Sequence, residues 1–392
     1  MNKEGLLKYF DSIFGQEPVI VRSPGRVNLM GEHTDYNKGF VLPAAIDKAI
    51  YMAASKREDD ELHFVSSDLK ETYRGSLHDL KPSSMHWPDY ILGVIQQLKN
   101  NGHTIGGMNC VFGGDIPIGA GMSSSAALEC ATLFALNEIY GLGLDRLSIA
   151  KMAQKAENDF VGVQCGIMDQ FANMFGRAEH LIRLDCRSLS YEYIPFDFKN
   201  TTILLLDTGV KHSLASSEYN TRRKQCEAGV QLVKRHHPEV QSLRDVTMEM
   251  LDEHVLASDK IIYQRCKYIV EENRRLLNAC KDLQSGNVHA FGKKMFETHE
   301  GLSKLYEVSC EELDFLVTQV KKHPGVLGSR MMGGGFGGCT INLVKDNAVD
   351  ALVKEVGTAY QRSMNKELKA YLTKIENGTA LTSLGVEAMT LK

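Results

Sequence analysis

The spacing of apolar residues changes along this chain, and the change limits its fold more than any other feature. Short apolar runs with polar flanks, at residues 108–112 (MNCVF) and 201–207 (TTILLLD), predict buried strands. Longer segments with one apolar face predict helices at 88–100, 123–140, 145–161, 213–236, 262–283, 288–306, 311–322 and 348–363. Because the strands and helices are largely segregated, we expect an α+β fold and not a doubly wound sheet.

Further strands are predicted near the ends of the chain. Residues 18–21 and 40–43 predict strands on either side of a glycine- and charge-rich turn, and 339–344 and 368–375 predict two more. At roughly 100–200 residues per domain, the 392 residues suit two domains. We place the boundary near residue 175, which divides 1–175 from 176–392.

Composition and charge exclude several classes of protein. The 45 basic and 49 acidic residues are interspersed, unlike the basic patches of nucleic-acid binders. No apolar run approaches the roughly 20 residues that cross a bilayer, and the first residues have helical spacing and not a signal-peptide pattern. The nine cysteines are scattered singly, as in reduced cytosolic proteins. We expect a cytoplasmic monomer that binds neither nucleic acid nor membrane.

Residues 117–129 read PIGAGMSSSAALE and place two glycines and three serines ahead of a predicted helix. Glycine permits positive φ and the close approach of a ligand, and a helix N-terminus offers free N–H groups to an anion. The loop therefore suits the phosphates of a nucleotide, although GxxxxGK[ST] is absent. An ordinary glycine turn with a serine N-cap is the alternative.

Residues 25–37 read GRVNLMGEHTDYN and gather charged groups between two apolar segments. Carboxylates and an imidazole can hydrogen-bond several vicinal hydroxyls, which sugar recognition requires. Such a site rejects analogues that lack a hydroxyl. A solvated turn is the alternative, and a metal site at His33 and Asp35 lacks a recognisable third ligand.

Asp169 lies among apolar residues in CGIMDQF, where an acidic side chain needs a partner or a function. It suits a general base or an orienting carboxylate for an attacking hydroxyl, with Arg26 as the cation that keeps it ionised. An N-cap or a structural ion pair is the alternative. Glu157, on a predicted helix, could bind Mg²⁺ together with a serine hydroxyl and phosphate oxygens, or could be helix surface.

A third motif, residues 328–339 (GSRMMGGGFGGC), has five glycines between Gly333 and Gly338. So many glycines are entropically costly unless the backbone needs them. We expect this run to pack closely against the nucleotide loop or the substrate, and a flexible hinge is the alternative.

Together these segments resemble the galactokinase branch of the GHMP kinases. GRVNLMGEHTDYN is the most specific match, and the others are PIGAGMSSSAALE, CGIMDQF, LDCRSL (184–189), HSLASSEYNTRRKQCE (212–227) and MGGGFGGCTI. The resemblance runs in order through nearly the whole chain. It implies an N-terminal domain of the ribosomal-protein-S5-like kind and a ferredoxin-like C-terminal domain, with the active site between them. Residues 376–392 could pack back on the first domain.

The resemblance also implies an activity, the phosphorylation of the anomeric hydroxyl of α-D-galactose by Mg-ATP, which opens the Leloir pathway. Asp169 and Arg26 would form the catalytic pair. The other implied roles are galactose binding by Glu32, His33, Asp35, Gly166 and Tyr219; ATP binding by Gly119, Ala120, Gly121, Met122, Ser123, Ser124, Ser125 and Trp87; and Mg²⁺ binding by Ser125 and Glu157. For Trp87, a plain core role is the alternative.

The chain departs from the family pattern at Met332, where a threonine or serine is usual. The missing hydroxyl weakens contact with the phosphates unless the backbone suffices. Two other functions share these motifs: a kinase for N-acetylgalactosamine, galacturonate or arabinose, and a sensor that binds galactose and ATP without turnover. Asn37 argues against N-acetylgalactosamine, and the intact serine loop argues against the sensor.

Overall fold

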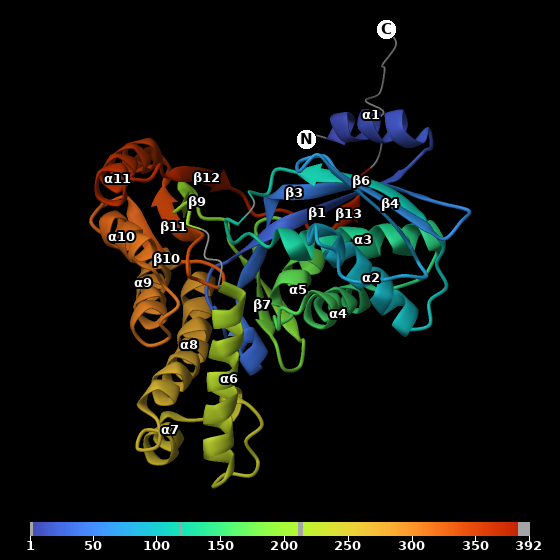
Figure 1. Ribbon diagram of the computed structural model, residues 1–392. Coiled ribbons are helices and arrows are strands. Elements are labelled where there is room, and N and C mark those ends of the chain that lie inside the picture. The colour runs from blue at the N-terminus through green and yellow to red at the C-terminus, as the bar shows by residue number, and fades with distance from the viewer. Residues whose placement is uncertain (1–2, 118, 211–214, 383–392) are drawn as a thin grey trace.

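The computed structural model describes residues 3–117, 119–210 and 215–382. Figure 1 shows two groups of elements, with the N-terminal strands, their helices and the last strand, β13, on the right and the elements from β9 to β12 on the left. The strands pair antiparallel, except β4 and β6, which are parallel. The predicted α+β class is confirmed.

The first group is built on a six-stranded sheet that helices cover on both faces. Leu6 and Phe10 of α1 (Lys3–Phe14) pack on one face, and α2 and α3 contribute to the core cluster that contains the strand residues of the other face. β3 is therefore buried at most positions. The strands lie in the order β13 (Ala380–Leu381), β1 (Val19–Asn28), β3 (Pro43–Lys56), β6 (Met108–Gly114), β4 (Glu61–Ser66) and β5 (Glu71–Ser76).

Four helical segments of this group carry or border the candidate site residues. They are α2 (Trp87–Asn100), α3 (Ser124–Tyr140), α4 (Arg146–Ala156) with a π-helical turn (Glu157–Val161), and α5 (Met168–Phe175). The three helices predicted at 88–100, 123–140 and 145–161 are confirmed, although the last ends in the π-helical turn. Such turns occur often at functional sites, and this one begins at Glu157.

The second group is built on a four-stranded antiparallel sheet with helices packed beside it. The sheet order is β10 (Val326–Met331), β11 (Cys339–Lys345), β9 (Thr201–Asp207) and β12 (Lys369–Thr373). The helices are α6 (Ala215–Lys234), α7 (Met248–His254), α8 (Lys260–Gln284), α9 (Val288–Lys304), α10 (Glu311–Val320) and α11 (Val349–Met364). The helices predicted from 213 to 363 are confirmed within the described residues, and residues 213–214 lie outside them.

A small third sheet joins the two halves of the sequence. It has the order β2 (Phe40–Val41), β7 (His180–Asp185) and β8 (Tyr191–Pro195). Because this sheet takes strands from both sides of residue 175, the boundary there stays a prediction.

The turn predicted directly after Val21 is wrong, because β1 continues to Asn28. β1 stays paired with β3 as far as Asn28 and Pro43, with a register shift between Pro24 and Arg26. The irregularity absorbs the proline and the glycine that indicated a turn. As a result, Arg26 stands on a strand of the sheet and not on a loop.

The end of the described chain returns to the first sheet. β13 pairs with β1, where Leu381 opposes Val21. Thr379 is fully buried and bonds to Ser23 and Asn173. Residues 383–392 lie outside the described residues.

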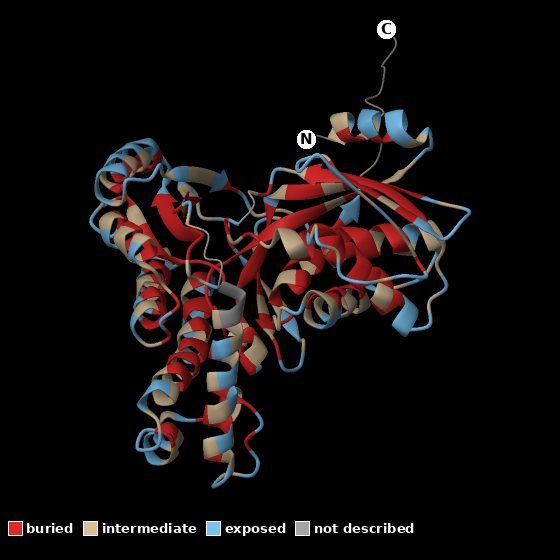
Figure 2. Ribbon diagram, viewed as in Figure 1, coloured by how far each residue is buried: buried red, intermediate tan, exposed pale blue. Residues whose placement is uncertain are grey.

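Buried residues lie along the strands of both groups of elements and on the helices that pack against them, as Figure 2 shows. The largest core cluster includes Trp87 and Met332, so the side chain at the position that departs from the family pattern is a core residue. Within the described residues, no helix is both long enough and apolar enough to span a membrane.

Candidate active site

Arg26 and Asp169 form an ion pair at the centre of the candidate site. Arg26 Nε donates to Asp169 Oδ1 at 2.8 Å, and Nη2 donates to Oδ2 at 3.0 Å. The arginine side chain is 6% exposed and that of Asp169 is 25% exposed. The bidentate geometry fixes the carboxylate and leaves part of it accessible to a substrate.

The phosphate loop meets this pair directly. Arg26 Nη1 donates to the carbonyl oxygen of Gly121 at 2.5 Å, and the Ser123 hydroxyl donates to Asp169. Three segments far apart in the sequence, β1, the loop at 119–125 and α5, therefore converge on one carboxylate, as the sequence predicts.

Ser123 occupies the N-cap position of α3 in the left-handed region, at φ 57°, and its side chain makes no capping bond. The predicted serine N-cap is thus wrong for its side chain, because that hydroxyl bonds to Asp169 instead. The first N–H groups of α3 keep their capacity for an anion. Gly119 and Gly121, with φ of 81° and 77°, shape the approach to this helix end.

Two other residues of the loop, Ala120 and Met122, have buried side chains. Ala120 and Met122 are buried in the core, and the carbonyl oxygen of Met122 accepts from Arg26 N at 3.1 Å. Of the loop residues predicted to bind ATP, these two could offer only main-chain groups.

The third glycine run packs on the phosphate loop. A Cβ on Gly333 would lie 3.6 Å from the carbonyl oxygen of Gly121, and one on Gly338 would lie 3.7 Å from Ala120 C. Both glycines have positive φ. The close packing against the phosphate loop that the sequence predicts is confirmed.

His33 is held between two groups in a single tautomer. Its Nε2 lies 3.2 Å from the carbonyl oxygen of Gly334, which can only accept, so Nε2 carries the proton. Nδ1 then accepts from the Tyr36 hydroxyl at 2.7 Å. Burial lowers the pKa of His33 to about 4, so the imidazole is neutral at neutral pH.

Asp35, Gly166 and Tyr219 lie around His33 and Asp169. A Cβ on Gly166 would lie 2.1 Å from Asp35 Oδ2, so only glycine fits there. The ring of Tyr219, on α6, is 5.2 Å from that of His33. Burial, followed by the charge of Asp169, raises the pKa of Asp35 to about 7.

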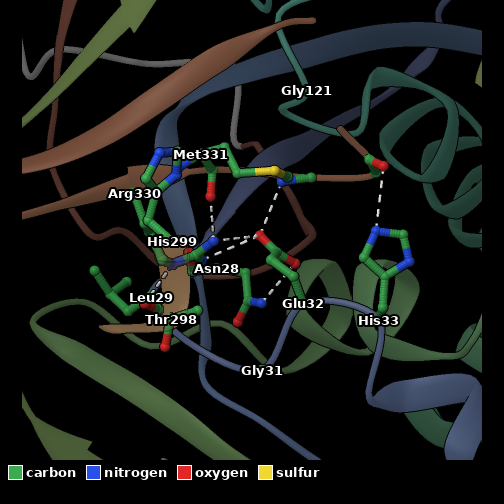
Figure 3. Close-up of polar contacts among 12 residues, drawn as sticks. Asn28, Leu29, Gly31, Glu32, His33, Gly121, Thr298, His299, Arg330 and Met331 are labelled. Atoms are coloured by element: carbon green, nitrogen blue, oxygen red, sulfur yellow. Dashed lines mark hydrogen bonds and ion pairs between the residues drawn. The ribbon is translucent and has the colours of Figure 1, made fainter. Parts of the chain in front are cut away.

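Glu32 is buried next to His33 in the sequence, and Figure 3 shows its carboxylate facing Arg330. Its Oε1 accepts from Arg330 Nη1 and Nη2, both at 3.0 Å, and from Gly333 N at 2.8 Å. Its Oε2 accepts from Asn28 at 2.8 Å. The sequence analysis missed Arg330, although it lies only a few residues before the glycine run.

Glu157 and Ser125 lie together, because the Ser125 hydroxyl bonds to the Glu157 carboxylate. Gln170 also donates to Glu157 Oε2 at 2.8 Å. Burial, followed by the charge of Asp169, raises the pKa of Glu157 to about 7. The described residues contain no cluster of three His, Cys, Asp or Glu side chains that would hold a metal without other ligands.

Trp87 lines a pocket of ≈ 280 Å³ that opens beside the phosphate loop. Tyr90 and Phe112 add aromatic surface, and Ser124 and Ser125 line the same pocket. The indole N–H donates to Glu71 at 2.7 Å. Trp87 therefore packs in the core and also forms a wall of this pocket.

Family models match three parts of the chain. They are the galactokinase galactose-binding signature over residues 8–56, the N-terminal domain of GHMP kinases over 89–177 and the C-terminal domain of GHMP kinases over 279–362. The candidate catalytic pair thus draws Arg26 from the first match and Asp169 from the second.

Known proteins resemble the chain over almost its whole length. A galactokinase of Roseiflexus sp. is 40% identical, with 95% of each chain covered, and one of Thermosipho africanus is 42% identical, covering 87% of this chain and 93% of the relative. The crystal structure of Lactococcus lactis galactokinase complexed with galactose aligns with a TM-score of 0.92 at 35% identity, covering 96% of this chain and 99% of the other. Methanococcus jannaschii mevalonate kinase shares the fold at 20% identity, with a TM-score of 0.65 over 92% of this chain and 99% of its own.

Proposed function

This chain belongs to the galactokinase family of the GHMP kinases, and from that premise we propose that it transfers the γ-phosphoryl group of ATP to the anomeric hydroxyl of galactose. The observation that carries the proposal is the Arg26–Asp169 pair, held against the phosphate loop through Gly121 and Ser123. An acceptor hydroxyl beside Asp169 would lie next to the loop that suits the phosphates.

Asp169 receives or orients the anomeric proton. Its carboxylate is partly accessible, and the bonds from Arg26 and Ser123 fix its direction. As the hydroxyl oxygen attacks phosphorus, its proton passes to an Asp169 oxygen and ADP departs. Arg26 stabilises the negative charge at the reacting centre. Phosphoryl transfer depends mainly on positioning of the reactants and on neutralisation of the phosphate charge.

Glu32, His33, Asp35, Gly166 and Tyr219 recognise the sugar. Glu32 and Asp35 supply carboxylate acceptors, His33 an imidazole and Tyr219 a phenol. Gly166, which has no side chain, leaves room for the buried carboxylate of Asp35. Buried polar groups of this kind discriminate strongly between hydroxyl patterns, because a missing hydroxyl leaves one of them unpaired.

Mg²⁺ fits the donor set at Ser125 and Glu157. This ion prefers oxygen ligands, keeps several waters and commonly takes one or two carboxylates together with substrate phosphates. A hydroxyl already bonded to a buried carboxylate beside the phosphate loop supplies that chemistry. When bound, the ion would neutralise phosphate charge, and Ser125 and Glu157 would hold it.

The adenine base would occupy the pocket of Trp87, Tyr90 and Phe112. Aromatic faces suit a planar base, and the same pocket reaches Ser124 and Ser125 at the start of α3. One nucleotide could therefore place its base against Trp87 and its phosphates at the helix N-terminus.

We also propose that the protein works in the cytoplasm as a monomer. All nine cysteines are free thiols, seven of them buried, as expected of a protein from a reducing compartment. Size-exclusion chromatography with light scattering tests the oligomeric state.

A panel of sugars tests the function. Purified protein with Mg-ATP is given galactose, N-acetylgalactosamine, galacturonate, arabinose and glucose, and ADP release is recorded. We expect galactose to give the highest kcat/KM. Faster turnover of another sugar would assign the protein to a different sugar kinase, and binding of galactose without any ADP release would favour the sensor.

A further inference from the structure

We propose that Arg330 is a positioning residue for sugar recognition, which reaches from β10 in the second group of elements to orient the Glu32 carboxylate in the first. The inference rests on the proposed function, in which Glu32 binds a sugar hydroxyl. Figure 3 shows the two side chains facing each other, with the Asn28 side chain also directed at Glu32.

Arg330 is completely buried, and its guanidinium has a partner for every N–H. Nε donates to the carbonyl oxygen of Leu29 at 2.8 Å, Nη1 donates to Glu32 and to the carbonyl oxygen of Met331, and Nη2 donates to Glu32 and to that of Asn28. Five donors therefore meet five acceptor contacts, which locks the plane of the guanidinium. Two of these carbonyls belong to the segment that leads to Glu32.

The bonds to Glu32 leave its two oxygens in different states. Oε1 accepts two bonds from Arg330 and one from Gly333 N, so the protein saturates it. Oε2 accepts one bond, from Asn28, and keeps capacity for another donor. Because Arg330 fixes Oε1, it also fixes the direction in which the remaining lone pairs of Oε2 can accept a hydrogen bond.

The stability of the fold alone does not explain why Arg330 and Glu32 form a buried ion pair. The arginine side chain is 0% exposed and that of the glutamate 2% exposed, and apolar residues of similar size often replace a buried pair without loss of stability. A fixed acceptor, in contrast, is what a hydroxyl-reading site needs. The same Glu32 oxygen also holds Gly333, which packs on the phosphate loop.

The test uses galactose and its 2-, 3-, 4- and 6-deoxy analogues, with kcat/KM measured for each. Comparison of Glu32→Gln with the wild type identifies the hydroxyl that Glu32 reads. We expect Arg330→Lys, which keeps the charge but loses the planar fork, to lose discrimination at that same hydroxyl by at least about tenfold. Discrimination at the other hydroxyls should stay within about twofold.

Arg265→Lys is the matched control. Arg265 is also buried, and its hydrogen bonds go to the Leu305 carbonyl and to Glu307, which are not proposed sugar-binding residues. Arg265→Lys should leave the ratio of kcat/KM for galactose to kcat/KM for each deoxy analogue unchanged. If loss of stability alone changed these ratios, Arg330→Lys and Arg265→Lys would change them equally.

The double variant Arg330→Met with Glu32→Gln decides the matter if a single variant does not fold, because it leaves no unpaired buried charge. It should discriminate among the deoxy sugars as Glu32→Gln alone does, because Arg330 acts through Glu32. Full discrimination in Arg330→Lys, or losses spread over several hydroxyls in either variant, would overturn the proposal. Wild-type protein that does not phosphorylate galactose would instead contradict the proposed function.

Discussion

Single residues carry the chemistry of this site, and Asp169 is the residue whose replacement tests it most simply. Asp169→Asn keeps the size and the contact with Ser123 but cannot accept a proton. We expect kcat to fall by about 10²–10⁴-fold, while galactose binding stays measurable by calorimetry. Asp350→Asn, at an exposed position of α11, serves as the control. Near-normal kcat in Asp169→Asn would remove Asp169 from the proton-accepting role.

Asp35 makes the stability of the ligand-free protein depend on pH. Burial, followed by the charge of Asp169, raises its pKa from 3.8 to about 7 in the folded state. Between these values the folded protein binds more protons than the unfolded chain, so this group lowers the free energy of unfolding as the pH rises. An asparagine at this position cannot ionise, so the free energy of unfolding would no longer fall with rising pH because of this side chain.

We therefore expect Asp35→Asn to gain stability over the wild type at about pH 8 relative to about pH 5, by up to about 1.4 kcal/mol for each pH unit between about pH 5 and the folded-state pKa of about 7. Urea unfolding at both values measures the difference. An equal difference at the two values would show that Asp35 is ionised throughout this range.

The sequence predicts part of this site for a physical reason. An aspartate among apolar residues needs a cation, and Arg26 is indeed its partner. The bond from Ser123 to Asp169 and the bonds from Arg330 to Glu32 were not predicted. Neither Ser123 nor Arg330 lies in a local sequence pattern that requires a partner, as an aspartate among apolar residues does.

At the scale of elements, the third glycine run depends on individual backbone positions. Gly335 has φ of 87°, and a Cβ there would lie 2.1 Å from the carbonyl oxygen of Val308. Gly335→Ala should therefore lower the free energy of unfolding by at least about 1 kcal/mol from backbone strain alone. Thermal or urea unfolding checks this.

Gly334→Ala is the control one residue away. Its Cβ would lie 3.4 Å from the Tyr219 ring, an ordinary contact, and its backbone is outside the left-handed region. Similar stability losses for the two variants would contradict the account of this loop.

The helices are predictable from periodicity, but several strands are not. β5 (ETYRGS) is mostly polar and half exposed, so its apolar pattern is too weak to indicate a strand. The π-helical turn at Glu157 continues a helical pattern, and periodicity does not distinguish it from α-helix. The sequence pattern ends β1 too early because Pro24 and Gly25 usually indicate a turn, whereas pairing with β3 overrides them here.

At the scale of the whole molecule, the returning C-terminal segment stabilises the first group of elements. Thr379 is fully buried, and its hydroxyl bonds to Asn173 and Ser23. Thr379→Val keeps the shape but removes the hydroxyl, which should cost about 1–3 kcal/mol of stability. Thr358→Val, at an exposed position of α11, should change stability little. Equal unfolding midpoints for the two variants would contradict a structural role for this segment.

Periodicity and composition do not predict how the two groups of elements are arranged. The site takes Arg26, Glu32 and Asp169 from the first group and Tyr219 and Arg330 from the second. Only the resemblance to the GHMP kinases indicated a site between two domains, since no spacing rule places β10 beside the loop after β1.

The position of phosphate on the product tests the central claim most directly. Phosphorus NMR of a reaction with galactose and Mg-ATP should show a new sugar phosphate whose phosphorus couples to the anomeric proton, in an amount equal to the ADP formed. Phosphate on any other hydroxyl, or loss of ATP without a sugar phosphate, would contradict a kinase that directs the anomeric hydroxyl to Asp169.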